Sequence, residues 1–355
     1  MKEWRLLDTG PLPASHNMTL QWVLLNSRHN NWAPNTLHLL QFKPHNALVG
    51  YHQAVELEIE EEYCKQHNIE INRRISGGGC IYMDEGQLGW EVTALKDTPG
   101  IPQNLNDMYK LLCECAIAGI AKLGVTARYR PINDIEVDGR KISGTGGSEY
   151  ANSFIFHGTL LTDFSVETMI NCLKLPLKKL DDKQVDTFKK RVVSLKELLG
   201  DLPPIEEIKE AMVEGFSEVL GIKLVPGRLT EEEKALFEKE LPRFMSEEWI
   251  RDTRSIKQAS SLQLIDYKAP GGLIRVSLVM DRARQLIKSV FITGDFFAYP
   301  ENCILDLEAA LKNTSVRTEK MEENVMRFFA KPDVKIPGVT AEDMIAALKA
   351  AVNTY

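Results

Sequence analysis

The sequence predicts an α+β fold, in which a mixed or antiparallel sheet with helices packed on it is followed by a small α+β domain. Over the first 165 residues, strand-like segments alternate with turn residues and only two strong helical patterns. A charged helical stretch then covers about 203–240, and strand-like segments return after about residue 256. For a chain of 355 residues we expect two domains, a larger one over 1–252 and an accessory one over 253–355.

The first strands are predicted from composition and from the turn residues between them. Residues 36–42 and 47–51 have strand composition and flank the turn-forming run Lys-Pro-His-Asn. Further strands are expected at 69–71, 80–83 and 86–95. These short segments indicate a sheet assembled from antiparallel pairs.

Two helices are expected among these strands. Residues 54–68 are predicted to form one amphipathic helix, and 104–124 form the clearest helix, with apolar residues at helical spacing and Gly124 as its stop. A hairpin follows, with Asp138-Gly139 as its tight turn, and residues 153–161 form another strand.

The second half begins with helices and ends with a separate strand-and-helix set. Residues 203–221 start with proline and end with glycine, and 230–241 start with a threonine cap followed by acids. Three strands are expected after about residue 261, with turns at Gly271-Gly272 and near Asp281. The last helices are predicted at 303–313, 319–330 and 340–353.

Composition narrows the class of protein. The chain is 44% hydrophobic and 26% charged, as in soluble globular proteins, and it lacks the roughly 18-residue apolar run that spans a bilayer. Its N-terminus has no signal-peptide core. Six cysteines without a CxxC pair indicate reduced thiols in the cytoplasm. A formal charge of −7 argues against nucleic acid as a partner, and we expect no membrane association.

The segment Arg-Arg-Ile-Ser-Gly-Gly-Gly-Cys, residues 73–80, is the first candidate site. Consecutive glycines let backbone N–H groups approach an anion, and arginines add bidentate donors, so the segment suits a phosphate or a carboxylate. It matches neither a Walker A loop nor a dinucleotide fingerprint. The alternative is a glycine-rich turn or bulge with solvated arginines at a sheet edge.

A second cluster, residues 133–144, repeats this chemistry with a lysine. Lys141 follows a tight turn and precedes glycine-rich backbone, which places a compact charge where a phosphate and a carbonyl can be reached together. Asp134 is a candidate Mg²⁺ ligand beside a phosphate. The alternative explanations are that Lys141 is an ordinary surface lysine, that Asn133-Asp134 only forms a turn, and that His157 is a buried histidine of a strand.

Together these motifs resemble the lipoate–protein ligase A family of the biotin/lipoate ligase superfamily. Four stretches carry the resemblance in the family's order: "LQFKPHNALVGYHQ", "RRISGGGCIYMDEGQLGWEV", "NDIEVDGRKISG" and "FHGTLL". The resemblance covers roughly residues 1–250. "FITGDFF" and its surroundings resemble the accessory C-terminal domain of bacterial ligases.

The resemblance implies activation of lipoate with ATP and Mg²⁺ to lipoyl-AMP, and transfer of the lipoyl group to a lysine of a lipoyl-accepting carrier domain by a monomeric enzyme. Lys141 would contact the carboxylate and the α-phosphate, Asp134 the metal, and Arg74 with the glycines the lipoyl and phosphate path. The site residues it implies are Lys141 as catalytic residue and, for binding, Arg74, Ser76, Gly77, Gly78, Gly79, Cys80, Gln87, Asn133, Asp134, Ser143, Gly144, His157 and Thr159.

The sequence departs from the family pattern at several motif positions. Cys80 replaces the usual alanine, Met83 a histidine and Gln87 an asparagine, while Phe156 precedes His157 in place of a second histidine. One alternative is therefore an octanoyltransferase of the same fold, with Cys80 as acyl-thioester nucleophile. The other is a lipoyl-binding protein without catalytic activity. A small buried hydrophobe in place of alanine is the simpler explanation of Cys80.

Overall fold

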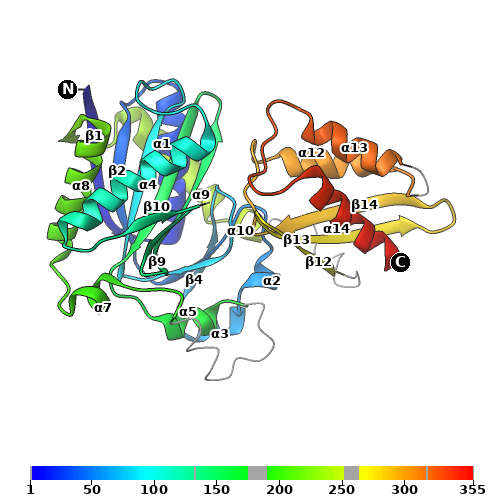
Figure 1. Cartoon of the computed structure of the whole chain (residues 1–355), viewed down its shortest axis with the longest axis horizontal. Helices are drawn as coiled ribbons and strands as arrows, with labels where there is room; N and C mark the ends of the chain where they lie inside the picture. Colours follow the sequence, from blue (N-terminus) through cyan, green and yellow to red (C-terminus); the bar gives the residue numbers. More distant parts are fainter. Residues whose placement is uncertain (1, 132, 175–189, 252–263, 317–318, 355) are drawn as a thin grey trace. The chain divides into compact units, whose positions relative to one another are not determined.

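The computed structural model describes residues 2–131, 133–174, 190–251, 264–316 and 319–354, and it shows the predicted α+β fold (Figure 1). The chain divides into two compact units. Unit 1 contains residues 1–48, 59–72 and 81–245, and unit 2 contains residues 49–58, 73–80 and 246–355. Unit 2 therefore includes two segments of the N-terminal half, one of them the glycine-rich motif. The domain boundary predicted at residues 252 and 253 lies outside the described residues.

Unit 1 is built on an eight-stranded mixed sheet of order β11-β1-β2-β6-β10-β9-β8-β7. Its strands are β11 (Ile222–Pro226), β1 (Lys2–Leu12), β2 (Thr36–Phe42), β6 (Gln87–Leu95), β10 (Ser153–Leu161), β9 (Arg140–Tyr150), β8 (Asp134–Val137) and β7 (Arg128–Arg130). β1 pairs in parallel with β11 and β2, and the other pairs are antiparallel.

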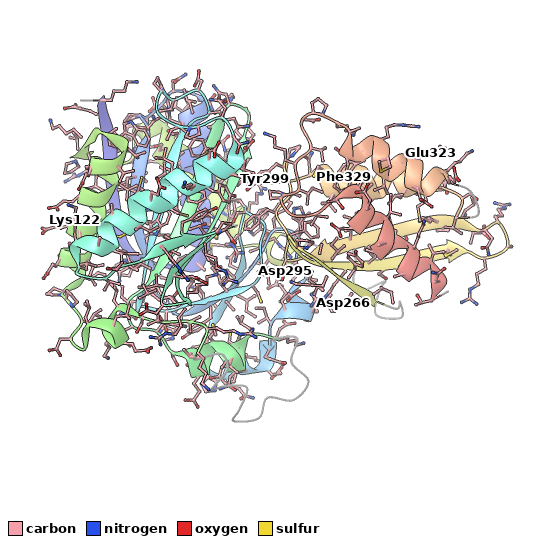
Figure 2. The ribbon with its side chains drawn as sticks, viewed as in Figure 1. Lys122, Asp266, Asp295, Tyr299, Glu323 and Phe329 are labelled. Atoms are coloured by element: carbon pink, nitrogen blue, oxygen red, sulfur yellow. The ribbon has the colours of Figure 1, made fainter. Side chains whose placement is uncertain are left out.

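One face of this sheet carries α4 (Leu105–Lys122) and α8 (Ile205–Leu220), which pack on each other. Trp90 of β6 is fully buried, with its ring centroid 5.7 Å from that of Phe156 in β10 and 5.2 Å from that of Phe216 in α8. Lys122, labelled on α4 in Figure 2, adds ion pairs to two glutamates of α8 at 3.5 and 3.0 Å. The main hydrophobic core lies on this face.

The other face carries α1 (Ala14–His29), against which α9 (Glu231–Phe244) packs. β1 and α1 are not among the elements predicted from the sequence. Eleven of the sixteen α1 residues are buried, among them polar ones such as Asn17 and Gln21, so the helix has no clean apolar stripe to reveal it. Among the described helices, none is both long and apolar enough to cross a membrane.

A small sheet of order β4-β3-β5 joins β4 (Glu70–Arg73), β3 (Asn46–Val49) and β5 (Ile81–Met83). The single helix expected over 54–68 is wrong. The structure has two short helices, α2 (Val55–Glu58) and α3 (Glu61–Gln66). Ile59 leaves the helix to form a β-bridge with Leu173, and the Glu60 N–H donates to the Cys172 carbonyl, so tertiary pairing overrides the helical pattern.

The C-terminal part of unit 2 is a three-stranded antiparallel sheet covered by helices, drawn from yellow to red in Figure 1. It consists of β12 (Leu264–Ala269), β13 (Gly272–Asp281), β14 (Leu286–Gly294), α12 (Cys303–Leu311), α13 (Lys320–Phe329) and α14 (Ala341–Asn353). These elements confirm the predicted strands and helices and enclose a core of their own.

The structure also contains three short helices, α5 (Val166–Cys172), α7 (Leu195–Leu199) and α10 (Glu247–Arg251). The predicted hairpin is confirmed, because Asp138 and Gly139 both have positive φ, at 50° and 78°. The predicted cap is also confirmed, since the Thr230 side chain and Glu233 form a capping box at the start of α9.

Candidate functional site

Lys141 and Asp134 form an ion pair on the β8–β9 hairpin. The Lys141 Nζ lies 2.8 Å from the Asp134 Oδ1, and the two side chains are 39% and 24% exposed. Gly144, directly opposite Asp134, makes room for this pair, because a Cβ at Gly144 would lie 2.7 Å from both Cε and Nζ of the lysine. The lysine backbone is also fixed, since its N–H donates to the Arg191 carbonyl and its carbonyl accepts from the Val193 N–H.

The pair lies on the α1 face of the large sheet. His157 of β10 is directly opposite Glu91, whose carboxylate accepts a hydrogen bond from Gln21 of α1. Because side chains alternate along a strand, Thr159 and Gln87 share this face with His157. Gly158, on the other face, leaves space that the Trp90 ring fills. The face thus brings together six of the predicted residues: Gln87, Asp134, Lys141, Gly144, His157 and Thr159.

Two predicted residues of the same hairpin have other surroundings. The Asn133 Nδ2 donates to the Thr145 carbonyl at 2.8 Å, which secures the start of β8 against β9. Ser143 is fully buried and alternates with Gly144, so its side chain points to the α4 and α8 face with Thr145. The structure therefore does not bring Ser143 onto the face that carries Lys141.

A buried polar network next to this face escaped the sequence analysis. The His38 Nδ1 lies 2.9 Å from the Glu91 Oε2, and its Nε2 lies 2.8 Å from the Thr9 Oγ1. Thr9 sits at an irregularity in the pairing of β1 with β2, which aims its hydroxyl at the histidine. The signal was a charged Glu91 within an otherwise uncharged strand and a histidine within "TLHLLQF".

In unit 2, the glycine-rich motif packs tightly against the segment that follows β14. A Cβ at Gly77 would lie 2.7 Å from the Phe296 carbonyl oxygen, and one at Gly78 2.8 Å from the Phe297 ring. The Gly78 N–H donates to that same carbonyl at 3.1 Å. Gly78 also has φ of 92°, a conformation that glycine adopts without strain. In this structure the glycines therefore serve close backbone packing. The alternative predicted from the sequence, a turn or bulge with solvated arginines, is wrong about the arginines, because both are buried.

The two arginines of the motif are buried and hold backbone carbonyls. The Arg73 guanidinium, 1% exposed, donates to the carbonyls of Gly50, Tyr51 and Gln53 through Nη1, and its Nε donates to those of Trp249 and Ile250. The Arg74 Nη2 donates to the carbonyls of Gly77 and Gly79 at 3.1 and 2.7 Å. Burial lowers the pKa of the Arg74 guanidinium to about 10. Both guanidinium groups thus stabilise the loop through hydrogen bonds to buried backbone carbonyls.

Cys80 lies beside an acid at the end of the motif. Its Sγ is 3.9 Å from the Glu58 Oε2, and Glu58 is paired with Arg275, which also lies 3.3 Å from Asp266 of β12, labelled in Figure 2. Burial and then the Glu58 carboxylate raise the pKa of the Cys80 thiol to about 12, against the opposing charge of Arg74. In this arrangement Cys80 is a protonated thiol.

We expect Cys80 to react slowly with alkylating reagents. At pH 8 its alkylation by iodoacetamide should be about 10²–10³ times slower than that of a cysteine with an ordinary pKa, because only the thiolate reacts. Mass mapping of the Cys80 peptide against time and pH measures the rate. Glu58→Gln removes the neighbouring charge and should speed the reaction. A wild-type rate at pH 8 equal to that of free cysteine would contradict this geometry.

The predicted residues are thus divided between the two units. Lys141, Asp134, Asn133, Gln87, Ser143, Gly144, His157 and Thr159 belong to unit 1, whereas Arg74, Ser76, Gly77, Gly78, Gly79 and Cys80 belong to unit 2. Within the described residues, no three His, Cys, Asp or Glu side chains gather as a metal-binding group. Asp134 offers one carboxylate, which fits a Mg²⁺ ion that takes most of its ligands from phosphate and water.

Comparison with known proteins identifies the family of the chain. Residues 13–217, more than half of the chain, match the model of the lipoyl protein ligase A/B catalytic domain. The chain belongs to this family. The match contains six of the eight strands of the large sheet, among them those that carry Lys141 and Asp134, and it also contains the glycine-rich motif.

Proteins named octanoyltransferase and proteins named lipoate protein ligase both resemble the chain. It is 30% identical over 271 residues to the octanoyltransferase LipM of Geobacillus kaustophilus, covering 69% of this chain and 97% of that protein. A solved bi-partite lipoate protein ligase from Thermoplasma acidophilum, described with its E2 lipoyl domain, is 25% identical with a TM-score of 0.64, covering 71% of this chain and 97% of that one.

A further solved structure resembles nearly the whole chain in fold. The structure of LipL1 from P. falciparum in complex with lipoate has a TM-score of 0.74 at 16% identity and covers 98% of this chain and 99% of that one. At this identity the likeness concerns the fold alone. The likeness covers nearly the whole chain, whereas the match to the LipM relative covers 69% of it.

Proposed function

We propose that this enzyme transfers an acyl group of the octanoyl or lipoyl class to a lysine of a lipoyl-accepting protein domain. The observation that carries the proposal is the Lys141 ammonium held beside Asp134 on a sheet face that also presents His157 and Thr159. Acyl transfer builds negative charge on the carbonyl oxygen, and a fixed cation stabilises that charge. The relatives' names supply the acyl class and the acceptor.

Octanoyl transfer is the first candidate reaction, ahead of the ATP-dependent activation that the sequence motifs suggested. The LipM relatives, named octanoyltransferases, support this order. In the transfer, the acceptor amine attacks a thioester carbonyl, a C–N bond forms, the C–S bond breaks, and the donor thiol leaves with a proton. The high pKa of Cys80 works against a covalent intermediate on that thiol, so we expect the amine to attack the donor directly.

ATP-dependent ligation is the second candidate. The specific observation in its favour is the likeness, at 25% identity, to the bi-partite lipoate protein ligase from Thermoplasma acidophilum. In this reaction Lys141 would bind the substrate carboxylate and the α-phosphate of ATP, and Asp134 would hold Mg²⁺. The reduced state of all six cysteines fits a reaction in the cytoplasm.

The acyl donor that the enzyme uses distinguishes octanoyl transfer from ATP-dependent ligation. The protein and a lipoyl acceptor domain are incubated either with octanoyl carrier protein or with ATP, Mg²⁺ and free lipoate or octanoate, and the acceptor is weighed by mass spectrometry. We expect modification from octanoyl carrier protein without ATP, and we expect Cys80→Ala to retain it. Modification that requires ATP would establish the ligase, and an acyl thioester isolated on Cys80 would establish the covalent route.

A further inference from the structure

Two buried thiols of unit 1 are in direct contact. The Sγ atoms of Cys64 in α3 and Cys172 at the end of α5 lie 3.3 Å apart, although the residues are 108 positions apart in the chain. Both are fully buried. A disulfide bond is about 2.05 Å long, so the sulfur atoms would need to approach by only about 1.3 Å.

The backbone around the two thiols is already aligned. Ile59 forms an antiparallel bridge with Leu173, and the Glu60 N–H donates to the Cys172 carbonyl at 2.9 Å. The Cys64 N–H in turn donates to the Glu60 carbonyl at 3.0 Å. A bond between the sulfurs would therefore join two segments whose main chains are fixed beside each other.

We propose that Cys64 and Cys172 form a dithiol site that a hydroperoxide oxidises to a disulfide, linking α3 to α5. This site is separate from Lys141 and Cys80 and does not depend on the proposed function. Either sulfur can donate in this contact, and a hydrogen bond from the S–H of Cys172 favours the thiolate of Cys64. Accordingly the pKa of Cys64 is lowered, whereas those of Cys80, Cys113 and Cys303 are each raised to about 12.

The reaction balances with hydrogen peroxide as the only oxidant. The Cys64 thiolate attacks one peroxide oxygen, the O–O bond breaks, and hydroxide leaves and takes up a proton as water, which gives a sulfenic acid on Cys64. The Cys172 sulfur then attacks the Cys64 sulfur, the S–O bond breaks, and the hydroxyl leaves with the Cys172 proton as a second water. Two thiols and one peroxide thus give one disulfide and two waters.

Access to the buried thiols follows from the short helices that carry them. α3 has six residues and α5 has seven, and helices of this length open locally at low cost compared with the core of a domain. The Ser165 N–H at the start of α5 donates to the Asp84 carboxylate, which also lies 3.4 Å from the Gln87 amide. The disulfide would therefore tether the same group of segments that holds Gln87 in place.

The test oxidises the full-length native protein with hydrogen peroxide, removes the peroxide with catalase, and maps the remaining thiols by alkylation and mass spectrometry without reduction. We expect the loss of two of the six thiols and a linked peptide pair containing Cys64 and Cys172, both reversed by dithiothreitol. Cys64 should be lost at least about tenfold faster than Cys80, because thiolates react and thiols do not. The melting temperature should rise by roughly 5 °C, because the bond closes a long loop.

Substitutions test whether the cross-link is specific to Cys64 and Cys172. Cys64→Ser and Cys172→Ser should each prevent the linked peptide, and Cys303→Ser, which removes another buried thiol, should leave it unchanged. If Cys64 and Cys172 remain alkylatable after the folded wild-type protein has lost Cys80, the proposal is overturned. It is equally overturned by a sulfinic acid on Cys64 without a cross-link. These wild-type results decide the question even if a variant does not fold.

Discussion

Lys141→Ala is expected to lower acyl transfer to a lipoyl domain by about 10²–10³-fold or more while the protein stays folded. The ammonium is the cation that the structure fixes on the α1 face, 2.8 Å from the Asp134 carboxylate. Its side chain is 39% exposed, so its removal leaves no large cavity. The measurement is the initial rate of acceptor modification with saturating donor, together with a thermal unfolding curve.

Lys223→Ala is the matched control for this prediction. Lys223 in β11 also pairs with an acid at 2.8 Å, the Glu3 carboxylate of β1, on the same sheet. Its removal should change neither rate nor stability appreciably, since exposed ion pairs contribute about 0–1 kcal/mol. A Lys141→Ala protein with the same rate as the Lys223→Ala protein would show that Lys141 is an ordinary surface lysine.

Arg73→Met is expected to cost about 3 kcal/mol or more in the free energy of unfolding. The guanidinium is 1% exposed and donates to five backbone carbonyls, and loss of one buried donor leaves its acceptors desolvated. Urea unfolding followed by tryptophan fluorescence measures the change. Trp249 reports on the same segment, because its indole N–H donates to the Arg73 carbonyl.

The control for Arg73 is an exposed arginine, Arg128, whose partner is a carboxylate and not a set of buried carbonyls. Arg128 lies 3.7 Å from the Glu136 carboxylate and is 72% exposed, so Arg128→Met should change the free energy of unfolding by less than about 1 kcal/mol. Equal destabilisation by the two substitutions would mean that Arg73 does not hold the loop in solution.

The sequence-based predictions succeeded where the signal is local. The turn at Asp138-Gly139, the cap at Thr230 and the stop at Gly124 depend on conformations or hydrogen bonds within a few residues, so composition reveals them. The same holds for the strands β12 to β14, because their alternation and turns lie within one stretch. The family resemblance, carried by motifs in order, was confirmed by the match to its catalytic domain.

The predictions failed or stayed open where the cause is distant in sequence. The break at Ile59 depends on Leu173, and the packing of Gly77 and Gly78 depends on Phe296 and Phe297. No local pattern contains those partners. The buried contact of His38 with Glu91 likewise joins two strands more than fifty residues apart. Its local signals were the charged Glu91 in an otherwise uncharged strand and the histidine in "TLHLLQF".

The glycine-rich motif shows why composition alone left two explanations. Glycine lets either an anion or another backbone segment approach closely, and both situations give the same sequence pattern. In the structure the Gly78 N–H has a carbonyl partner and both arginines hold carbonyls of their own chain. Anion binding by this loop remains a prediction that binding measurements with Arg74→Met protein can address.

The central claim, transfer of an acyl group to a lysine of a lipoyl-accepting domain, is tested most directly by the intact mass of such a domain. The domain is incubated with this protein and octanoyl carrier protein, and in parallel with ATP, Mg²⁺ and lipoate. We predict a mass increase of one acyl group in at least one mixture, lost when the acceptor lysine is replaced by arginine. An unchanged mass in both mixtures, under conditions where a known family member modifies the same domain, would contradict the claim.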